Sequence, residues 1–273
     1  MKKVLSVQDL SCMGKCSLTV ALPILSCMGI SCSVLPTAVL STHTGFPAPY
    51  RQAMDITAMA DHWSAVGAEF DAVGVGYLAN PQQAEAVEGI LEKFPVFTVI
   101  DPAMGDHGRV YKGLPPEQVA AMARLCRRGD VLLPNVTEAA LLTGLPYRPR
   151  ADMAYLRELT EGMLSFGAKG VVITGLCWEE GYTGFVGSHR DLGFFTYKAP
   201  RVPRNLHGTG DMFAAVCTGA LTLGQDLCAA AKLAAGFVER VVDNTETITP
   251  YGGEFESQLP WLWQNRKSKP EGV

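Results

Sequence analysis

Short runs of apolar and β-branched residues alternate along the chain with longer segments in which apolar residues recur at helical spacing. Each short run ends in a small or polar residue, as expected for a buried strand that opens into a loop. The runs predict strands at residues 3–7, 31–36, 72–76, 96–100, 131–133 and 170–174. The longer segments predict helices at residues 17–28, 53–66, 81–94, 116–126, 137–143, 151–165, 211–223 and 227–244.

This alternation predicts an α/β fold. Successive strand–helix–strand units place parallel strands side by side, so we expect a three-layer α/β/α arrangement with a mostly parallel central sheet flanked by helices. Residues 182–200 are an exception, because aromatic and β-branched residues flank a polar turn and predict an antiparallel pair. Pro23 falls within the first predicted helix, where it should kink the helix or delay its start. Residues 264–273 are expected to be loosely ordered.

The composition is that of a globular protein with a large core. Of 273 residues, 48% are hydrophobic and 18% are charged, which favours one domain spanning residues 1–273. No apolar segment approaches the roughly 20 residues that span a bilayer, and the N-terminus turns polar too soon for a signal peptide. We therefore expect a cytoplasmic protein that binds no membrane.

Charge and cysteine spacing exclude two further kinds of site. The net charge is −4, and Lys and Arg are spread too thinly to form the basic stripe of a nucleic-acid-binding protein. The eight cysteines form no C-x-x-C pair, which predicts reduced thiols rather than a zinc site. An anionic ligand must then be bound by local groups.

Polar residues follow most of the predicted strands. Ligands of parallel α/β sheets bind outside the carboxyl ends of the strands, so binding residues are expected at these positions. A crescent of polar side chains is predicted there, made of Asp9, His43, Thr44, Tyr77, Asp101, Asn135, Glu138, Thr174 and Asp211.

Two motifs that begin at these strand ends suit a cation. Asp101 and Asp106, in VIDPAMGD, could hold a divalent cation or its waters, position a ligand hydroxyl, or cap a turn. Asn135 and Glu138, in LLPNVTEAALL, lie three residues apart on nearly the same side of a helix. They could support magnesium-bound water or form a helix cap with a first-turn glutamate. The residues alone leave these alternatives open.

The stretch RNLHGTGDMFAAVCTGAL carries the most specific chemistry. Gly208, Thr209 and Gly210 place backbone N–H groups at the N-terminal end of a helix, where partial positive charge favours an anion. A phosphoryl group in transfer would be stabilised there, and Asp211 could accept the proton of an attacking hydroxyl. The alternative is a glycine-rich helix cap with an aspartate in the first turn.

Taken in order, these motifs resemble those of the ribokinase-like superfamily of small-molecule kinases and, within it, the pyridoxal kinases. The signature G-T-G-D corresponds to residues 208–211, and N-x-x-E to residues 135–138. The vitamin-kinase motif D-P-V-M-G-D reads D-P-A-M-G-D at residues 101–106. S-N-H-T-x-Y and G-Y-L-G are similar to residues 41–46 and 76–79. The resemblance covers nearly the whole chain.

The resemblance implies transfer of the γ-phosphoryl group of ATP, with Mg²⁺, to the 5′-hydroxymethyl group of pyridoxal, pyridoxine or pyridoxamine. It makes Asp211 the base and residues 208–211 the anion hole. It assigns to the site of ATP and magnesium the residues Asp101, Asp106, Asn135, Glu138 and Thr174, with Glu138 and Asp101 at the metal. It assigns to the vitamin pocket the residues Asp9, Thr44 and Tyr77. Family members are commonly homodimers and several respond to K⁺, so both properties are expected here.

Two departures leave the substrate open. Asp9 stands where many pyridoxal kinases have the serine of Q-S-H, and Phe46 stands where tyrosine is frequent. The alternative enzyme is a hydroxymethylpyrimidine or hydroxymethylpyrimidine-phosphate kinase of thiamine synthesis, which shares the fold and G-T-G-D. A catalytically silent regulator that binds vitamin or nucleotide is disfavoured by the intact Asp211. A nicotinamide-dependent oxidoreductase is disfavoured because no G-x-G-x-x-G follows the first strand.

Overall fold

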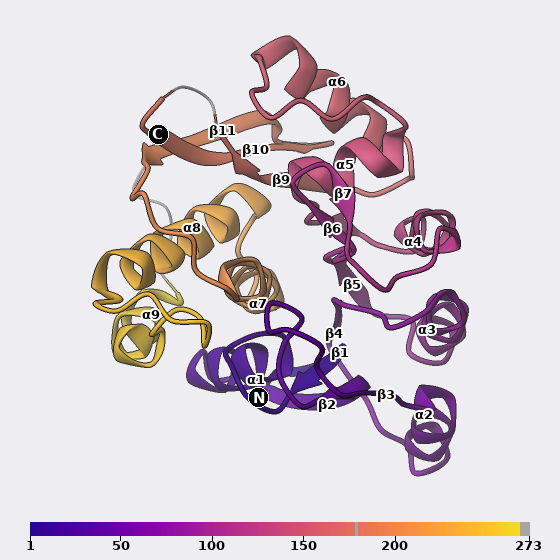
Figure 1. Cartoon of the computed structure of the whole chain (residues 1–273). Helices are drawn as coiled ribbons and strands as arrows, with labels where there is room; N and C mark the ends of the chain where they lie inside the picture. The colour runs from indigo at the N-terminus through magenta and orange to yellow at the C-terminus, as the bar shows by residue number, and fades with distance from the viewer. Residues whose placement is uncertain (178–179, 268–273) are drawn as a thin grey trace.

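The computed structural model describes residues 1–177 and 180–267. Its main strands are β1 (Lys3–Ser11), β2 (Ser31–Leu40), β3 (Arg51–Ala53), β4 (Ala72–Val75), β5 (Phe97–Ile100), β8 (Val131–Leu132), β9 (Gly170–Leu176), β10 (Tyr182–His189) and β11 (Gly193–Pro200). They form one nine-stranded sheet in the order β11-β10-β9-β8-β5-β4-β1-β2-β3 (Figure 1). The strands from β2 through β9 in this order run parallel, while β3, β10 and β11 pair antiparallel at the two edges.

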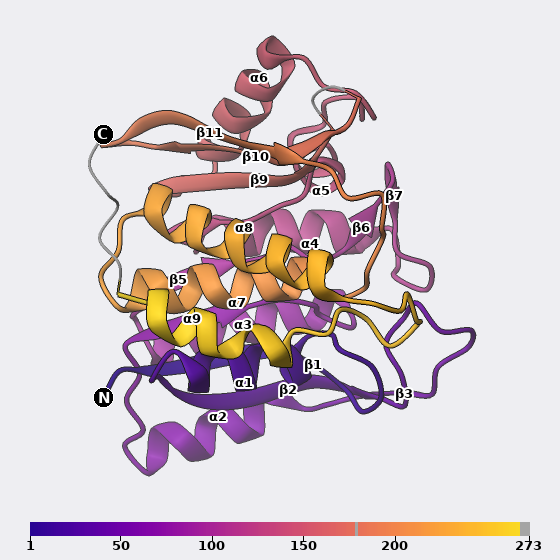
Figure 2. The same ribbon diagram turned by 90° about the vertical axis from the view of Figure 1, so that its left-hand side faces the viewer.

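Helices cover both faces of this sheet, as Figure 1 shows, and Figure 2 looks onto the layer that contains α7, α8 and α9. They are α1 (Leu18–Cys27), α2 (Ile56–Ala65), α3 (Pro81–Lys93), α4 (Glu117–Cys126), α5 (Val136–Thr143), α6 (Met153–Leu164), α7 (Thr209–Thr222), α8 (Leu227–Asn244) and α9 (Leu259–Asn265). One buried core joins α2 through α6 to the sheet, through residues such as Ile90 and Leu156. A second joins α1, α7, α8 and α9 to the other face, through residues such as Ile24 and Val216. The expected three-layer α/β/α fold and the antiparallel pair at residues 182–200 are confirmed.

Local sequence signals account for these helices, and α3 is an example. Asn80 accepts a hydrogen bond from the backbone N–H of Gln83 at 3.0 Å, and Pro81 occupies the first turn, where its missing N–H costs nothing. Val87 and Ile90 then recur at helical spacing and are buried against the sheet. A polar cap followed by an apolar stripe therefore fixes both the start and the buried face.

Several predicted boundaries were wrong. α1 begins at Leu18, so Pro23 inside it does not delay its start. Proline removes one hydrogen bond of the helix, but the completely buried Val20 and Ile24 hold the segment against its core. β1 continues to Ser11, and its register with β2 shifts between residues 8 and 10, which places Asp9 at an irregularity within the strand.

Other elements were missed because their signals are short. β6 (Gly105–Asp106) and β7 (Arg109–Val110) form a small hairpin, and a 3₁₀ turn (Glu256–Gln258) leads into α9. The expected loose tail was wrong for residues 264–265, which lie in α9, while residues 268–273 lie outside the described part of the chain. Within that part, no helix combines the length and the apolar character needed to cross a bilayer.

Candidate active site

A cavity of about 770 Å³ opens where the parallel strands end. The loops after β2, β4, β5 and β8 and the start of α7 supply much of its wall. It is lined by every residue that the sequence predicted for the site, namely Asp9, Thr44, Tyr77, Asp101, Asp106, Asn135, Glu138, Thr174, Gly208, Thr209, Gly210 and Asp211. The predicted crescent is therefore brought together by the fold.

The start of α7 is shaped by glycine. Gly208 is the residue before the helix and has φ of 84°, a left-handed conformation that favours glycine. A Cβ atom there would lie 2.0 Å from the carbonyl oxygen of Lys15. A Cβ at Gly210 would meet nothing within 4 Å. The first turn therefore contacts residue 15 closely on one side and leaves free backbone N–H groups beside open space on the other.

Asp211 is the third residue of α7 and lies in this first turn, three positions after Gly208, which occupies the cap position. Burial, together with the charge of Asp9, raises the pKa of its carboxyl group to about 7, although hydrogen bonds from the Ser17 backbone N–H and the Cys16 thiol act in the opposite direction. A carboxyl group with this pKa can both accept and release a proton near neutral pH.

Asn135 and Glu138 form the helix cap that was one of the two alternatives. The side-chain oxygen of Asn135 accepts from the Glu138 N–H at 2.9 Å, and the Glu138 carboxylate accepts from the Asn135 N–H at 2.8 Å. The same carboxylate accepts from the Met104 N–H at 3.0 Å. Glu138 is 2% exposed, and burial raises its pKa to about 8. The cap thus also ties α5 to the loop that follows Asp101.

The charge of this corner of the cavity fits a divalent cation. Burial, and then the charges of Glu138 and Asp211, raise the pKa of Asp101 well above its usual range. In the described residues no three His, Cys, Asp or Glu side chains converge as a metal cage. Mg²⁺ does not need one, because it is usually held by one or two carboxylates together with water and substrate phosphates. The residues present therefore fit magnesium that arrives with a nucleotide.

Asp9 forms a second buried polar centre in the cavity lining. It is 3% exposed, and its two carboxylate oxygens accept hydrogen bonds from Ser11 at 2.8 Å and Ser17 at 2.5 Å. Burial raises its pKa. No Lys or Arg in the described residues forms an ion pair with it; Arg51 lies near enough only to lower its pKa slightly. A cationic ligand group would supply the missing charge.

Tyr77 lies beside Asp9 with its hydroxyl group unpaired. The side chain is 7% exposed, lines the cavity, and its hydroxyl has no hydrogen-bond partner among the described residues. The guanidinium of Arg51 lies 5.9 Å from the centre of its ring. A buried hydroxyl without a partner is costly, which indicates that a ligand atom satisfies it.

The remaining predicted residues are Asp106, Thr44 and Thr174. Asp106 is on the β6–β7 hairpin, where its side chain is exposed and accepts from the His107 N–H at 2.7 Å. Thr44 is exposed in the loop after β2. Thr174 lies within β9 rather than after it and forms a bridge with Asn135. They line the cavity but do not join the buried carboxylates.

The cavity also contains groups that sequence reasoning did not assign. Among them are Ser11, Cys16, Ser17, Arg109, Lys112 and His207. Cys16 lies beside Asp211, and burial raises the pKa of its thiol strongly, so the thiol stays protonated. Arg109 and Lys112 place positive charge on the wall formed by the β6–β7 hairpin. The serines gave no signal, because a lone serine near a strand is common; His207 could have been noticed directly before the G-T-G-D signature.

Comparison with known proteins identifies the family. The model of the phosphomethylpyrimidine kinase family matches residues 26–255. The chain belongs to the phosphomethylpyrimidine kinase family. It is 30% identical over 256 residues to a pyridoxine/pyridoxal/pyridoxamine kinase of Bordetella bronchiseptica, with 89% of each chain covered. The resemblance to small-molecule kinases drawn from the motifs is confirmed.

Solved structures of similar sequence have the same fold. A crystal structure from Bacteroides thetaiotaomicron, described as a putative phosphomethylpyrimidine kinase with pyridoxal, is 32% identical and has a TM-score of 0.91, covering 99% of this chain and 97% of the other. The pyridoxal kinase of Lactobacillus plantarum is 30% identical with a TM-score of 0.89, covering 98% and 100%. The family match includes Asp101 through Asp211, whereas Asp9 precedes it.

Proposed function

We propose that this member of the phosphomethylpyrimidine kinase family transfers the γ-phosphoryl group of ATP to the 5′-hydroxymethyl group of pyridoxal and its relatives pyridoxine and pyridoxamine. The observation that carries the proposal is the start of α7, where free backbone N–H groups adjoin a carboxyl group with a pKa of about 7 inside one cavity. Anion stabilisation and proton acceptance at one place are what phosphoryl transfer to an alcohol requires. We propose that residues 1–273 form a single kinase domain.

In the proposed mechanism Asp211 accepts the proton of the attacking hydroxyl group. The N–H groups of Thr209 and Gly210 donate to the oxygens of the phosphoryl group in transfer, at the positive end of the α7 dipole. Asp101 and Glu138 would hold magnesium and its waters, and the bound ion would neutralise charge on the phosphates. Arg109 and Lys112 add positive charge at the outer wall. The need for K⁺ and the homodimer remain predictions of the resemblance, and the cytoplasmic location remains a prediction from the pattern of apolar and polar residues.

The vitamin is proposed to bind between Asp9, Tyr77 and Thr44. A pyridine nitrogen gains a positive charge when protonated, and the buried Asp9 carboxylate, which has only hydroxyl partners, would stabilise that charge. The unpaired Tyr77 hydroxyl would bond a ring substituent. This arrangement accounts for an aspartate at a position where related kinases use serine.

The direct test of the proposed function is a panel of alcohols with ATP and magnesium. Pyridoxal, pyridoxine, pyridoxamine and hydroxymethylpyrimidine are each offered, and the phosphorylated product and ADP are measured. We expect ADP to form in equal amount with a vitamin B6 phosphate, at a higher kcat/KM than with the pyrimidine. ATP turnover without a phosphorylated vitamer, or binding of pyridoxal without any product, would contradict the proposal.

The second candidate is a hydroxymethylpyrimidine or phosphomethylpyrimidine kinase. The name of the matching family favours it, and its heterocycle is of comparable size. The same panel decides between the two, because a higher kcat/KM for the pyrimidine than for all three vitamers would support the second candidate.

Replacing Asp9 tests the substrate side of the cavity. Asp9→Asn keeps the size of the side chain and removes its charge, so the KM for pyridoxal should rise about tenfold, the scale of one charge-assisted hydrogen bond. The KM for ATP should stay within about twofold, which makes it the internal control. If both KM values are unchanged in a steady-state assay, Asp9 does not bind the ring.

A further inference from the structure

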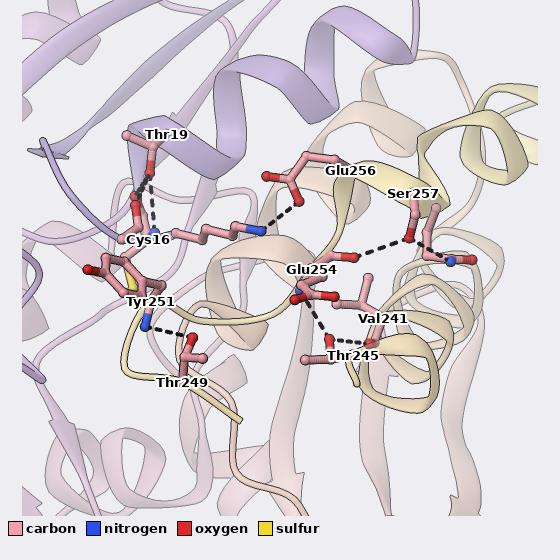
Figure 3. A network of polar contacts seen from close by, with 12 residues as sticks. Cys16, Thr19, Val241, Thr245, Thr249, Tyr251, Glu254, Glu256 and Ser257 are labelled. Atoms are coloured by element: carbon pink, nitrogen blue, oxygen red, sulfur yellow. Dashed lines mark hydrogen bonds and ion pairs between the residues drawn. The ribbon is translucent and has the colours of Figure 1, made fainter. Parts of the chain in front are cut away.

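Residues 249–256, here called the C-terminal loop, bind segments that are distant in sequence and that adjoin residues of the cavity wall. Figure 3 shows part of this network around Cys16, Tyr251 and Glu256. The backbone N–H of Lys15 donates to the Tyr251 carbonyl at 2.7 Å, and the Lys15 ammonium group lies 2.7 Å from the Glu256 carboxylate. The loop is also bound to Thr245, whose hydroxyl oxygen accepts a hydrogen bond from the Glu254 N–H at 3.0 Å.

The imidazole of His43 links this loop to the substrate side of the cavity. It is 3% exposed; its Nε2 lies 2.6 Å from the Pro250 carbonyl oxygen, and its Nδ1 accepts from the Gly45 N–H at 3.1 Å. A carbonyl oxygen only accepts, so Nε2 must carry the hydrogen. A backbone N–H only donates, so Nδ1 must present its lone pair. The two bonds together therefore require the neutral Nε2–H tautomer.

The same ring contacts the phosphate side of the cavity. His43 and His207 have ring centres 4.6 Å apart, and His207 directly precedes the Gly208 turn. The His207 carbonyl accepts from the Gly253 N–H at 3.3 Å, so the C-terminal loop also holds the backbone there. Burial lowers the pKa of His207, which keeps this second ring neutral. Gly14 leaves room for the pair, because a Cβ there would lie 2.4 Å from His43 Cδ2.

We propose that His43 is a positioning residue with two separable tasks. Its Nδ1 holds the Gly45 N–H and thereby the adjacent Thr44, on the side proposed to bind the vitamin. Its Nε2–H holds Pro250 and, through the C-terminal loop, the backbone of His207 that leads into the Gly208 turn. One neutral ring thus sets the positions of both substrate sites. This inference rests on the proposed function for the identity of the two substrates.

Two substitutions separate these tasks, because each amide side chain reproduces one ring nitrogen. The side-chain oxygen of Asn is the same number of bonds from Cβ as Nδ1, so His43→Asn keeps the acceptor for Gly45 and loses the donor to Pro250. The side-chain nitrogen of Gln corresponds to Nε2, so His43→Gln keeps the donor and loses the acceptor. His43→Ala removes both. His62→Gln, on the exposed face of α2, is the matched control.

Steady-state kinetics then give opposite expectations for the two variants. His43→Gln should raise the KM for pyridoxal about fivefold and leave the KM for ATP within about twofold, the scale of one lost hydrogen bond. His43→Asn should do the reverse, and His43→Ala should raise both. His62→Gln should change neither. If His43→Asn and His43→Gln shift the same KM, or if neither shifts one, the two tasks assigned to His43 are wrong.

Two measurements on the protein without substrates test the geometry independently of turnover. In ¹⁵N spectra at neutral pH, the ring of His43 should show the Nε2–H tautomer; an Nδ1–H tautomer or an imidazolium would overturn the proposal. Hydrogen exchange at the Lys15 amide, which donates to Tyr251, should accelerate in His43→Asn and stay unchanged in His43→Gln. Equal exchange in both variants would also overturn it. If the wild-type protein phosphorylates no vitamer, the proposed function fails, while these two measurements still decide the role of His43.

Discussion

Asp211→Asn is expected to lower kcat about 10³-fold while the KM values for ATP and pyridoxal stay within about twofold. The substitution keeps the shape and the hydrogen-bonding size of the side chain and removes its ability to accept a proton. The free N–H groups at the start of α7 remain in place, so binding of the phosphates should be kept. Steady-state kinetics with pyridoxal and ATP measure both effects.

The pH profile of the wild-type protein is the companion measurement. Burial holds the Asp211 carboxyl group protonated up to a pKa of about 7, far above the usual 3.8. Only the deprotonated form accepts a proton, so kcat/KM should rise with pH through about 7 and fall on the acid side. In Asp211→Asn, this decrease of kcat/KM at acid pH should be absent. Asp61→Asn, which changes an exposed residue of α2, should keep it. A loss of kcat smaller than about tenfold would show that Asp211 is not the base.

The arrangement of the sheet and its helices could be predicted because the signals are local and repeated. The α3 segment shows this, since a capping asparagine, a first-turn proline and a stripe of apolar residues all lie within residues 80–91. That the site residues lie close together could be predicted from the same pattern, because parallel strands bring their carboxyl ends to one edge of the sheet. That is why Asp101, Asn135 and Asp211, far apart in sequence, line one cavity.

The missed features depend on contacts between distant segments. The β6–β7 hairpin has two residues in each strand, too few for any alternation to be visible. Nothing near His43 in the sequence indicates Pro250, which lies more than 200 residues away and contacts it only in the folded chain. The partners of Asp9 were missed for a related reason, since β1 was expected to end before the irregularity at residues 8–10. Local patterns therefore predict where a site lies better than they predict which groups support it.

Gly208→Ala is expected to lower kcat/KM for ATP at least about 10²-fold and to lower the melting temperature. Two physical effects add at this position. An alanine at φ of 84° carries left-handed backbone strain of about 1–2 kcal/mol, and its Cβ would lie 2.0 Å from the Lys15 carbonyl oxygen. The clash must move either the first turn of α7 or the segment around Lys15. Either movement displaces the N–H groups proposed to bind the phosphates.

A glycine that follows the same helix allows the effect of backbone strain to be measured without the steric clash. Gly224 follows the C-terminal end of α7 with φ of 93°, and a Cβ there would meet nothing within 4 Å. Gly224→Ala therefore introduces comparable backbone strain at a position outside the cavity lining. It should lower the melting temperature by a few degrees and leave kcat/KM unchanged. Because the two variants share the strain, the kinetic difference between them measures the close approach of Lys15 to the turn. Equal kinetics in Gly208→Ala and Gly224→Ala would show that the shape of the Gly208 turn does not matter for phosphoryl transfer.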